Sequence, residues 1–345
     1  MGDRLDFLVV GAGPAGAVFA SRAAQRGYRV AVVEAVRPGW KVCGGAIPAL
    51  YEEQVGRVPR EAIVSEIRRF RVYLDGELLW EREGPLWGYL LDKAKFLELI
   101  LGDVQVYNGR VFDFEKRRVQ GLDLKWDRLV VAAGPLAPGY HGDRIYAVQA
   151  LYRGSFEPET IEIYFDSRLV GYYWVFALDE KTARVGVGGY GSPGEFLSML
   201  EVFARGLRAE PLEHPKGSYL NIGGASLETI RGDTIIVGEA AGYVYPVTGE
   251  GIRPAALSAA YTLGVVEGDR ESRKKLELLA RSINLQRKLL DFVKNASPEA
   301  RARFLRRMGG ELAMRVALGD MPAYARVLSL LPSRLASLIS KLLPR

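Results

Sequence analysis

Gly11-Ala12-Gly13-Pro14-Ala15-Gly16 is the stretch that decides the fold. It follows the apolar run Leu5–Val10, which is typical of a strand, and it opens a segment of helical spacing that extends to about Arg26. The first glycine of such a loop permits a tight turn, the second lets a pyrophosphate approach the backbone, and the third allows close helix–strand packing. The helix N-terminus then offers N–H groups to the phosphates. The stretch predicts a dinucleotide-binding βαβ unit.

Glu34 completes this unit. It follows a second expected strand at Arg29–Val33 and stands 23 residues after Gly11. A carboxylate at the end of that strand is placed to accept hydrogen bonds from ribose hydroxyls. Strand, loop, helix, second strand and terminal acid occur together, which argues against a simple structural turn. The fingerprint alone does not distinguish NAD from FAD.

The rest of the chain alternates between two kinds of pattern. Further expected strands of the nucleotide lobe are Val104–Phe114, Arg128–Ala133 and Thr234–Val237, and Leu91–Leu101 has helical spacing. Runs rich in Tyr, Ile, Val, Phe and Trp between residues 146 and 190 predict an antiparallel sheet. Asp75-Gly76 is a hairpin turn signal within Glu66–Glu83.

We therefore expect an α/β (α+β) protein of two interleaved lobes. The Rossmann-type nucleotide domain takes residues 1–65, 92–145 and 227–268, and the antiparallel sheet of the substrate domain takes 66–91 and 146–226. Residues 269–345 form a C-terminal helical region, with breaks near Pro298, Gly309-Gly310, Pro322 and Pro332.

Composition excludes several classes of protein. A single cysteine, Cys43, permits no intrachain disulfide, which fits a reducing compartment. The two histidines, His141 and His214, have no ligand cluster around them, so no metal site is expected. No apolar stretch approaches the roughly 18 residues of a membrane-spanning helix. We expect a cytoplasmic protein, and the scarcity of Asn, Gln, Cys, Met and His resembles the bias of hyperthermophile proteins.

Charge is distributed unevenly along the chain. Residues 270–345 hold 17 Lys and Arg against 6 Asp and Glu, within a chain whose net charge is +6. Basic stretches rich in leucine suit an anionic membrane surface, so we expect a peripheral location at the inner membrane face. The alternative is a set of solvated helices with basic outer faces. No nucleic-acid partner is expected, because no recognised binding motif accompanies these charges.

Three later segments resemble those of two-dinucleotide-type flavoproteins. Arg128–Gly134 is similar to their second flavin-contact strand, and Thr234–Gly242 resembles the motif whose acid binds the ribitol, with Glu239 where aspartate is usual. Pro246–Ile252 resembles the loop and helix start beside the flavin pyrimidine ring, where a helix N-terminus stabilises the negative charge of reduced flavin. This resemblance implies FAD as cofactor. A separate NAD(P)H domain is not expected, because there is no second glycine fingerprint.

The sequence further resembles the geranylgeranyl reductase family, flavoenzymes with a p-hydroxybenzoate hydroxylase-like fold. Lys41–Gly45 is similar to the family's cysteine–glycine loop beside the isoalloxazine, and Lys93 stands at the arginine position of its Arg-x-x-Phe helix start. Gly171–Phe176 is similar to its Tyr-x-Trp-x-Phe-Pro motif, with Ala177 in place of proline. The resemblance extends to about residue 262.

The resemblance implies reduction of C=C bonds in geranylgeranyl or other isoprenoid chains of lipids. Hydride would come from N5 of reduced flavin, and Cys43 is the candidate proton donor or relay. The electron donor stays open between NAD(P)H and a ferredoxin-like protein. The alternatives are an aromatic hydroxylase or monooxygenase of the same fold and a flavin-binding protein without turnover.

The candidate site residues fall into three groups. The candidate catalytic residue is Cys43, and the candidate substrate-binding residues are Tyr172, Trp174 and Phe176, which share one face of a strand. The candidate cofactor-binding residues are Gly11, Gly13, Pro14, Ala15, Gly16, Glu34, Lys41, Cys43, Gly44, Gly45, Lys93, Arg110, Val111, Ala133, Gly134, Gly238, Glu239, Gly249, Glu250, Gly251 and Ile252.

Simpler interpretations accompany several of these residues. Cys43 would then be a small buried thiol, and the three aromatic residues would be ordinary core. Lys93 would be a surface helix residue, and Glu250 and Arg253 would only cap or pair locally.

Overall fold

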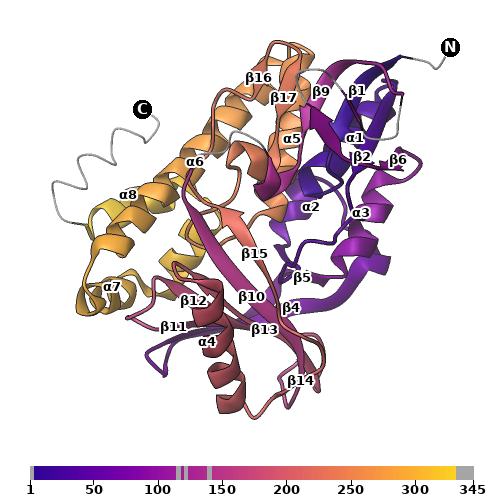
Figure 1. Cartoon of the computed structure of the whole chain (residues 1–345). Coiled ribbons are helices and arrows are strands. Elements are labelled where there is room, and N and C mark those ends of the chain that lie inside the picture. Colours follow the sequence, from indigo (N-terminus) through magenta and orange to yellow (C-terminus); the bar gives the residue numbers. More distant parts are fainter. Residues whose placement is uncertain (1–3, 114–117, 120–122, 138–141, 332–345) are drawn as a thin grey trace.

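Two large sheets form the body of the protein, with the helices packed against them (Figure 1). The structure is a computed structural model and describes residues 4–113, 118–119, 123–137 and 142–331. The first sheet occupies the upper right of Figure 1, the second lies below it, and the C-terminal helices lie at the left.

The first sheet is the predicted nucleotide-binding sheet. Its six strands lie in the order β16 (Ile230–Arg231), β17 (Thr234–Ile236), β9 (Trp126–Val131), β1 (Leu5–Val10), β2 (Val30–Glu34) and β6 (Gln105–Asn108). All neighbours are parallel except β16 and β17. The register pairs Val10 with Val33, so the glycine loop and Glu34 leave the sheet side by side at its carboxyl edge. In doubly wound folds that edge is where ligands bind.

Three helices cover one face of this sheet. They are α1 (Pro14–Gln25), α3 (Lys93–Leu101) and α5 (Ile252–Val266). Phe19 of α1, Phe96 of α3 and Leu263 of α5 are fully buried in one core with Val9 and Val32 of the sheet. Burial of these side chains supplies the main driving force for assembling the nucleotide lobe from distant segments.

The second sheet has nine strands. Their order is β14 (Glu210–Pro211), β10 (Arg144–Arg153), β13 (Thr182–Gly189), β12 (Gly171–Ala177), β11 (Thr160–Phe165), β4 (Ile63–Leu74), β5 (Glu77–Leu91) and β3 (Ala46–Pro48), with β15 (Lys216–Asn221) also paired to β10. Only β11 and β4 are parallel. Asp75 and Gly76 form the turn between β4 and β5, with φ angles of 51° and 86°. The predicted interleaving of two lobes is confirmed.

Several element boundaries differ from the sequence-based ones. Strand β3 and the first residues of β4 belong to the second sheet, although residues 1–65 were grouped with the nucleotide lobe. Strand β5 ends at Leu91. The Asp92 side chain accepts the Lys95 N–H at 3.1 Å and caps α3, which therefore begins at Lys93. The expected strand 104–114 divides. After β6 the Gly109 N–H donates to the Glu34 carbonyl at 3.0 Å, and β7 (Val111–Asp113) pairs instead with β8 (Arg118–Val119).

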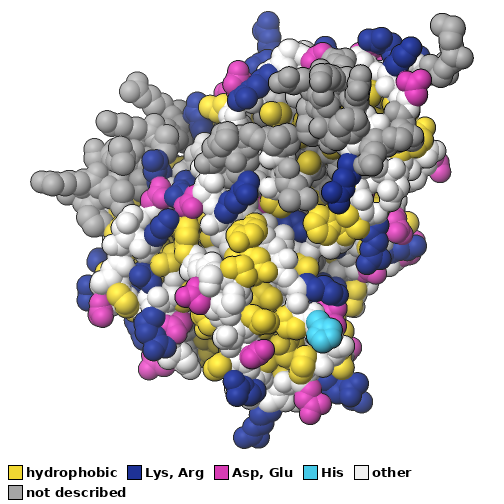
Figure 2. Space-filling model, viewed as in Figure 1, with side chains coloured by type: hydrophobic (Ala, Val, Ile, Leu, Met, Phe, Trp, Pro, Cys, Tyr) yellow, Lys and Arg dark blue, Asp and Glu magenta, His cyan; other side chains and the backbone are white. Residues whose placement is uncertain are grey.

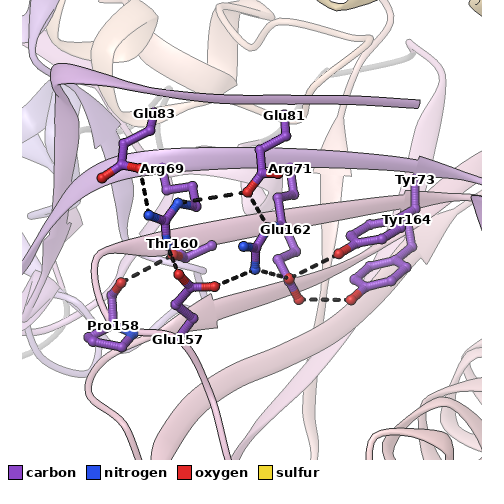
Figure 3. Close-up of polar contacts among 10 residues, drawn as sticks. All are labelled: Arg69, Arg71, Tyr73, Glu81, Glu83, Glu157, Pro158, Thr160, Glu162 and Tyr164. Atoms are coloured by element: carbon purple, nitrogen blue, oxygen red, sulfur yellow. Dashed lines mark hydrogen bonds and ion pairs between the residues drawn. The ribbon is translucent and has the colours of Figure 1, made fainter. Parts of the chain in front are cut away.

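The two faces of the second sheet have opposite character. Helix α4 (Pro193–Gly206) covers one end of the outer face through Phe196 and Leu200. The other end of that face carries the network of Figure 3, in which Arg71 contacts Glu81 at 2.8 Å and Glu162 accepts from Tyr164 at 2.7 Å. Side chains alternate along strands, so residues 161 and 163 of β11 point to the inner face. Around Ile161 and Ile163 that inner face is apolar.

The remaining helices are α2 (Leu50–Gln54), which was not predicted, and the expected C-terminal group. That group consists of α6 (Arg270–Asn295), α7 (Pro298–Ala317) and α8 (Met321–Leu328). Gly309 interrupts α7 with a φ of 67°, which kinks it at a break that the sequence predicted. Within the described residues, no helix is long and apolar enough to cross a membrane.

Candidate functional site

The glycine loop opens onto a cavity of about 930 Å³. Gly11 has a φ of +102°, and a Cβ on Gly16 would lie 1.9 Å from the Gly11 carbonyl oxygen. Gly11 and Gly16 are therefore required for the turn and for seating α1 on the sheet. A Cβ on Gly13 would meet no atom within 4 Å. Gly13 lines the cavity and leaves the backbone open to a close ligand.

Glu34 is fixed beside this loop. It is 7% exposed, and its carboxylate accepts the Ala12 N–H at 2.8 Å and the Val36 N–H at 3.1 Å. Each carboxylate oxygen has a further lone pair, so the group can still accept hydroxyl hydrogen bonds. Gly109 and Arg110 line the cavity next to it. This arrangement fits a nucleotide ribose.

Most of the predicted cofactor residues line this one cavity. They are Gly11, Gly13, Pro14, Ala15, Glu34, Lys41, Cys43, Gly44, Gly45, Lys93, Arg110, Ala133, Gly134, Glu239, Gly249, Glu250, Gly251 and Ile252. Gly16 and Gly238 act in packing instead, since a Cβ on Gly238 would lie 2.5 Å from the Ala15 Cβ. The side chain of Val111 lies outside the described residues.

Glu239 is held by two neighbours. Its carboxylate lies 2.6 Å from the Lys41 Nζ and accepts the Asn221 backbone N–H at 3.0 Å. Lys93 donates to the Lys41 carbonyl oxygen, so both lysines brace the same loop. Burial lowers the pKa of Lys93, and the nearby charge of Cys43 opposes that shift. Lys93 is thus part of the site, although it reaches the loop backbone as a single point charge.

The cysteine loop is supported by two residues that sequence reasoning missed. Gln149 of β10 donates to the Cys43 carbonyl at 2.9 Å, and Arg184 of β13 donates to the Gly44 carbonyl at 2.8 Å. Burial lowers the pKa of Arg184, again opposed by the charge of Cys43. The sequence contains one signal for this contact. Arg184 shares a strand face with Gly186 and Gly188, and glycines within a strand often mark the close approach of another group.

The loop before α5 is organised by a buried ion pair. Arg253 is 2% exposed, and it donates twice to the Glu250 carboxylate, each time at 2.8 Å. It also donates to Gln54 and to the Leu318 carbonyl, each at 3.0 Å. Glu250 therefore pairs with Arg253 and also lines the cavity. The Gly251 backbone and the start of α5 offer N–H donors to an anion.

The cavity continues from the cysteine loop across the inner face of the second sheet. Its floor there is apolar and includes Ile67, Phe70, Val72, Trp80, Ile161, Ile163 and Phe165. The three predicted substrate residues, Tyr172, Trp174 and Phe176, belong to the same floor. They form a chain of ring contacts, with centroids 6.0 Å apart for the first pair and 6.2 Å for the second. They therefore line a slot as well as packing together.

Two residues that line the cavity, Gln149 and Trp174, each have a buried polar atom without a partner among the described residues. The Nε1 of Trp174 and the Oε1 of Gln149 are buried and make no hydrogen bond within the described part of the chain. Both residues pair across Gly186, over which the Trp174 ring lies. Buried polar groups normally find a partner. This spot beside Cys43 is thus suited to a ligand or a water with both donor and acceptor atoms.

Helices α6 and α7 form the roof of the slot. Leu289, Leu290 and Val293 of α6 and Phe304, Leu305, Met308 and Met314 of α7 line it. Gly310 sits on Trp80 of β5, since a Cβ there would lie 1.9 Å from the indole ring. The C-terminal region is therefore part of the cavity wall, which its sequence did not reveal.

The fold and the site together define a flavin-dependent oxidoreductase. A family model described as pyridine nucleotide-disulphide oxidoreductase matches residues 5–163. A geranylgeranyl bacteriochlorophyll reductase-like protein of Thermoplasma acidophilum has the same fold, with a TM-score of 0.78, 20% identity and 99% of each chain covered. A myxobacterial FAD-dependent halogenase is also similar, with a TM-score of 0.64, 17% identity, and 99% of this chain and 97% of the halogenase covered.

Two relatives of higher sequence identity indicate the family. The digeranylgeranylglycerophospholipid reductase 1 of Methanopyrus kandleri is 31% identical over 296 residues, which cover 73% of this chain and 77% of that reductase. The digeranylgeranylglycerophospholipid reductase of Methanothrix thermoacetophila is 28% identical over 308 residues, 77% of this chain and 78% of that one. The chain belongs to the digeranylgeranylglycerophospholipid reductase family.

Proposed function

We propose that this protein binds FAD and reduces C=C bonds in the geranylgeranyl or other isoprenoid chains of lipids. One observation carries the proposal: a single cavity joins the glycine loop and Glu34 to the cysteine loop and then to the apolar slot. A dinucleotide and a long apolar chain would thus meet beside Cys43. The names of the relatives support the same substrate class.

The slot selects an apolar, unbranched or methyl-branched chain. Its floor and roof are built from aliphatic and aromatic side chains, and both ends of the aromatic row contact the cofactor loops. Tyr172 donates to the Thr248 carbonyl of the loop before α5, and Gly44 packs on the Phe176 ring. Burying a prenyl chain here would be driven by the hydrophobic effect and would exclude water from the reacting bond.

Reduced FAD would supply the hydride. An isolated C=C bond also needs a proton, and we assign it to the Cys43 Sγ. Lys93 and Arg184 contact the loop on either side of Cys43, through the carbonyl groups of Lys41 and Gly44. Their positive charges would stabilise the thiolate left after the proton moves to the alkene carbon, until water restores the proton.

Reoxidation of the reduced protein tests the function. The protein is loaded with FAD, reduced anaerobically and mixed with a geranylgeranyl glycerolipid, and flavin absorbance is followed. We expect the flavin to reoxidise and the lipid to gain two mass units per bond reduced. Consumption of O₂ coupled to oxygenation of an aromatic substrate, with no isoprenoid turnover, would instead support the hydroxylase alternative. Failure of every donor to reduce the bound flavin would support binding without turnover.

Cys43→Ala is expected to slow lipid-dependent reoxidation by about 10²–10⁴-fold, the usual contribution of a positioned acid. Cofactor affinity and anaerobic reduction should be retained, because the loop keeps its contacts through the Cys43 and Gly44 carbonyl groups and loses only the weak bond from the Gly45 N–H to the Cys43 Sγ. Stopped-flow absorbance measures the rate. Cys43→Ser keeps the size but has a far weaker acid, so it should be similarly slow. Wild-type rates in both variants would remove Cys43 from the reaction and leave it a packing residue.

We further propose that α6 to α8 approach an anionic membrane and that either NAD(P)H or a ferredoxin-like protein reduces the flavin. The excess of Lys and Arg in residues 270–345 supports the first point. Figure 2 shows basic side chains interspersed with acidic ones at the left of the face in view, where α7 lies, so the attraction would be moderate. Presenting the lipid in anionic and in neutral vesicles in the same assay tests it. Equal rates would contradict the membrane proposal.

A further inference from the structure

Arg301 lies in the wall of the slot beside the turn between β11 and β12, at the end of β12 remote from the cysteine loop. It belongs to the first turns of α7, and its Nη1 donates to the Ser167 carbonyl at 2.8 Å while its Nε donates to the Ala296 carbonyl at 3.1 Å. Phe176 packs against Gly44 of the cysteine loop. Gly171 lies five residues before Phe176 on β12, which corresponds to about 16 Å along a strand. Ser167 lies further in the same direction, in the turn between β11 and β12.

No carboxylate forms an ion pair within 4.0 Å of Arg301 in the described part of the chain, although the charge of Arg301 helps to lower the pKa of Glu299. The other formal charge lining the remote end is Asp166, which is paired with Arg168 at 2.8 Å. Near the cofactor loops, Lys41 pairs with Glu239 and Glu250 pairs with Arg253. Arg301 is therefore a cation set between apolar neighbours such as Leu305 and Leu169. The carboxylate of Asp75 lies at the same turn, where it accepts the Ser167 N–H at 2.8 Å.

The Arg301 guanidinium has N–H donors that are not used by the contacts described above. Of its five N–H groups, two are used by the carbonyl groups of Ser167 and Ala296. Arg301 is only partly buried, so its guanidinium is in part accessible to solvent. An anion held here would keep part of its hydration while the attached chain lay on the apolar floor.

We propose that Arg301 binds the phosphate of the lipid substrate and so sets which double bonds reach the cysteine loop. The proposal rests on the proposed function, because it treats the slot as the site of an isoprenoid lipid. Arginine recognises phosphate oxygens through paired, charge-assisted hydrogen bonds. Anchoring the phosphate at one end fixes the distance along the chain to Cys43.

The test compares the affinity of the holoenzyme for two lipids. One is a geranylgeranyl glycerol diether phosphate, and the other is the same lipid without its phosphate. Binding is followed by the fluorescence of Trp80, Trp87 and Trp174, which line the cavity, so that turnover is not required. For Arg301→Met we expect the Kd of the phosphorylated lipid to rise about tenfold or more, roughly 1.4 kcal/mol per factor of ten. The Kd of the neutral lipid should stay the same.

Further variants separate phosphate binding from a structural role. Arg301→Lys should recover part of the affinity, because it keeps the charge but not the planar fork. Arg303→Met is the matched control, since Arg303 is exposed on the same helix, and it should bind both lipids as the wild type does. A structural role for Arg301 would weaken both lipids equally and would overturn the proposal.

Two other outcomes point elsewhere. Equal affinity of the wild type for both lipids would overturn the phosphate anchor and leave the reductase proposal intact. Absence of binding by either lipid would overturn both. Competition by inorganic phosphate at concentrations near the lipid Kd, lost in Arg301→Met, would reassign the site to free phosphate and contradict a lipid-borne ligand.

Discussion

Arg253→Met is expected to lower the free energy of unfolding by about 3–5 kcal/mol, because it leaves the carboxylate of Glu250 unpaired in a buried setting. The Glu250 side chain is 14% exposed and the Arg253 side chain 2% exposed. The change also leaves the Leu318 carbonyl without this donor, so the end of α7 loses a link to the loop before α5. Chemical denaturation of the purified protein measures the loss.

Two comparisons make this expectation specific. Arg26→Met removes a partner of Glu267 in an exposed pair and should cost at most about 1 kcal/mol. Glu250→Met combined with Arg253→Met removes both charges, so it should recover much of the stability lost in the single variant. If the double variant is as unstable as the single one, the packing and carbonyl contacts of Arg253 matter more than the unpaired charge.

Gly13→Ala and Gly16→Ala are expected to fail in different ways. Alanine at Gly16 would place its Cβ 1.9 Å from a backbone oxygen, so α1 must move from the sheet. We expect a loss of roughly 1–3 kcal/mol in stability, together with loss of cofactor binding. Alanine at Gly13 has space and an ordinary φ of −76°, so the apoprotein should be as stable as the wild type within about 0.5 kcal/mol. Its methyl group nevertheless enters the cavity, and cofactor affinity should fall at least about tenfold.

Thermal unfolding of the apoproteins and titration with FAD measure these two quantities. The informative result is that Gly16→Ala lowers stability while Gly13→Ala lowers only cofactor affinity, although the two glycines stand three residues apart in one loop. Full cofactor affinity in Gly13→Ala would mean that the pyrophosphate does not approach this backbone, and the assignment of the loop to FAD would then be wrong. Undiminished stability in Gly16→Ala would contradict the close packing of α1.

The residues that were predicted well are those whose role is local. The turn at Gly11, the helix start at Pro14 and the acid at Glu34 belong to one short unit, and each follows from the geometry of its own segment. The kink at Gly309 and the hairpin at Asp75-Gly76 are likewise set by neighbouring residues. The resemblance of Lys41–Gly45 and of the Trp174 strand added the substrate class, which no local rule supplies.

The residues that were missed act across long separations. Arg184 and Gln149 support the cysteine loop from strands that lie more than 100 residues later in the chain. Nothing in their own segments indicates that partner. The split of the expected strand 104–114 has the same cause, because the Glu34 carbonyl and strand β8 compete for its backbone. Periodicity cannot show such competition.

The sequence by itself determined the glycine loop, the alternation of two lobes and most of the predicted residues that line the cavity, because a short segment contains both the turn and the helix start. Only the tertiary structure decided what surrounds that loop. It placed α7 over the apolar sheet as a roof, paired Glu250 with Arg253, and set Arg301 in the cavity wall without an ion pair to any described residue. These features depend on which distant surfaces meet, and that is set by the packing of the whole chain.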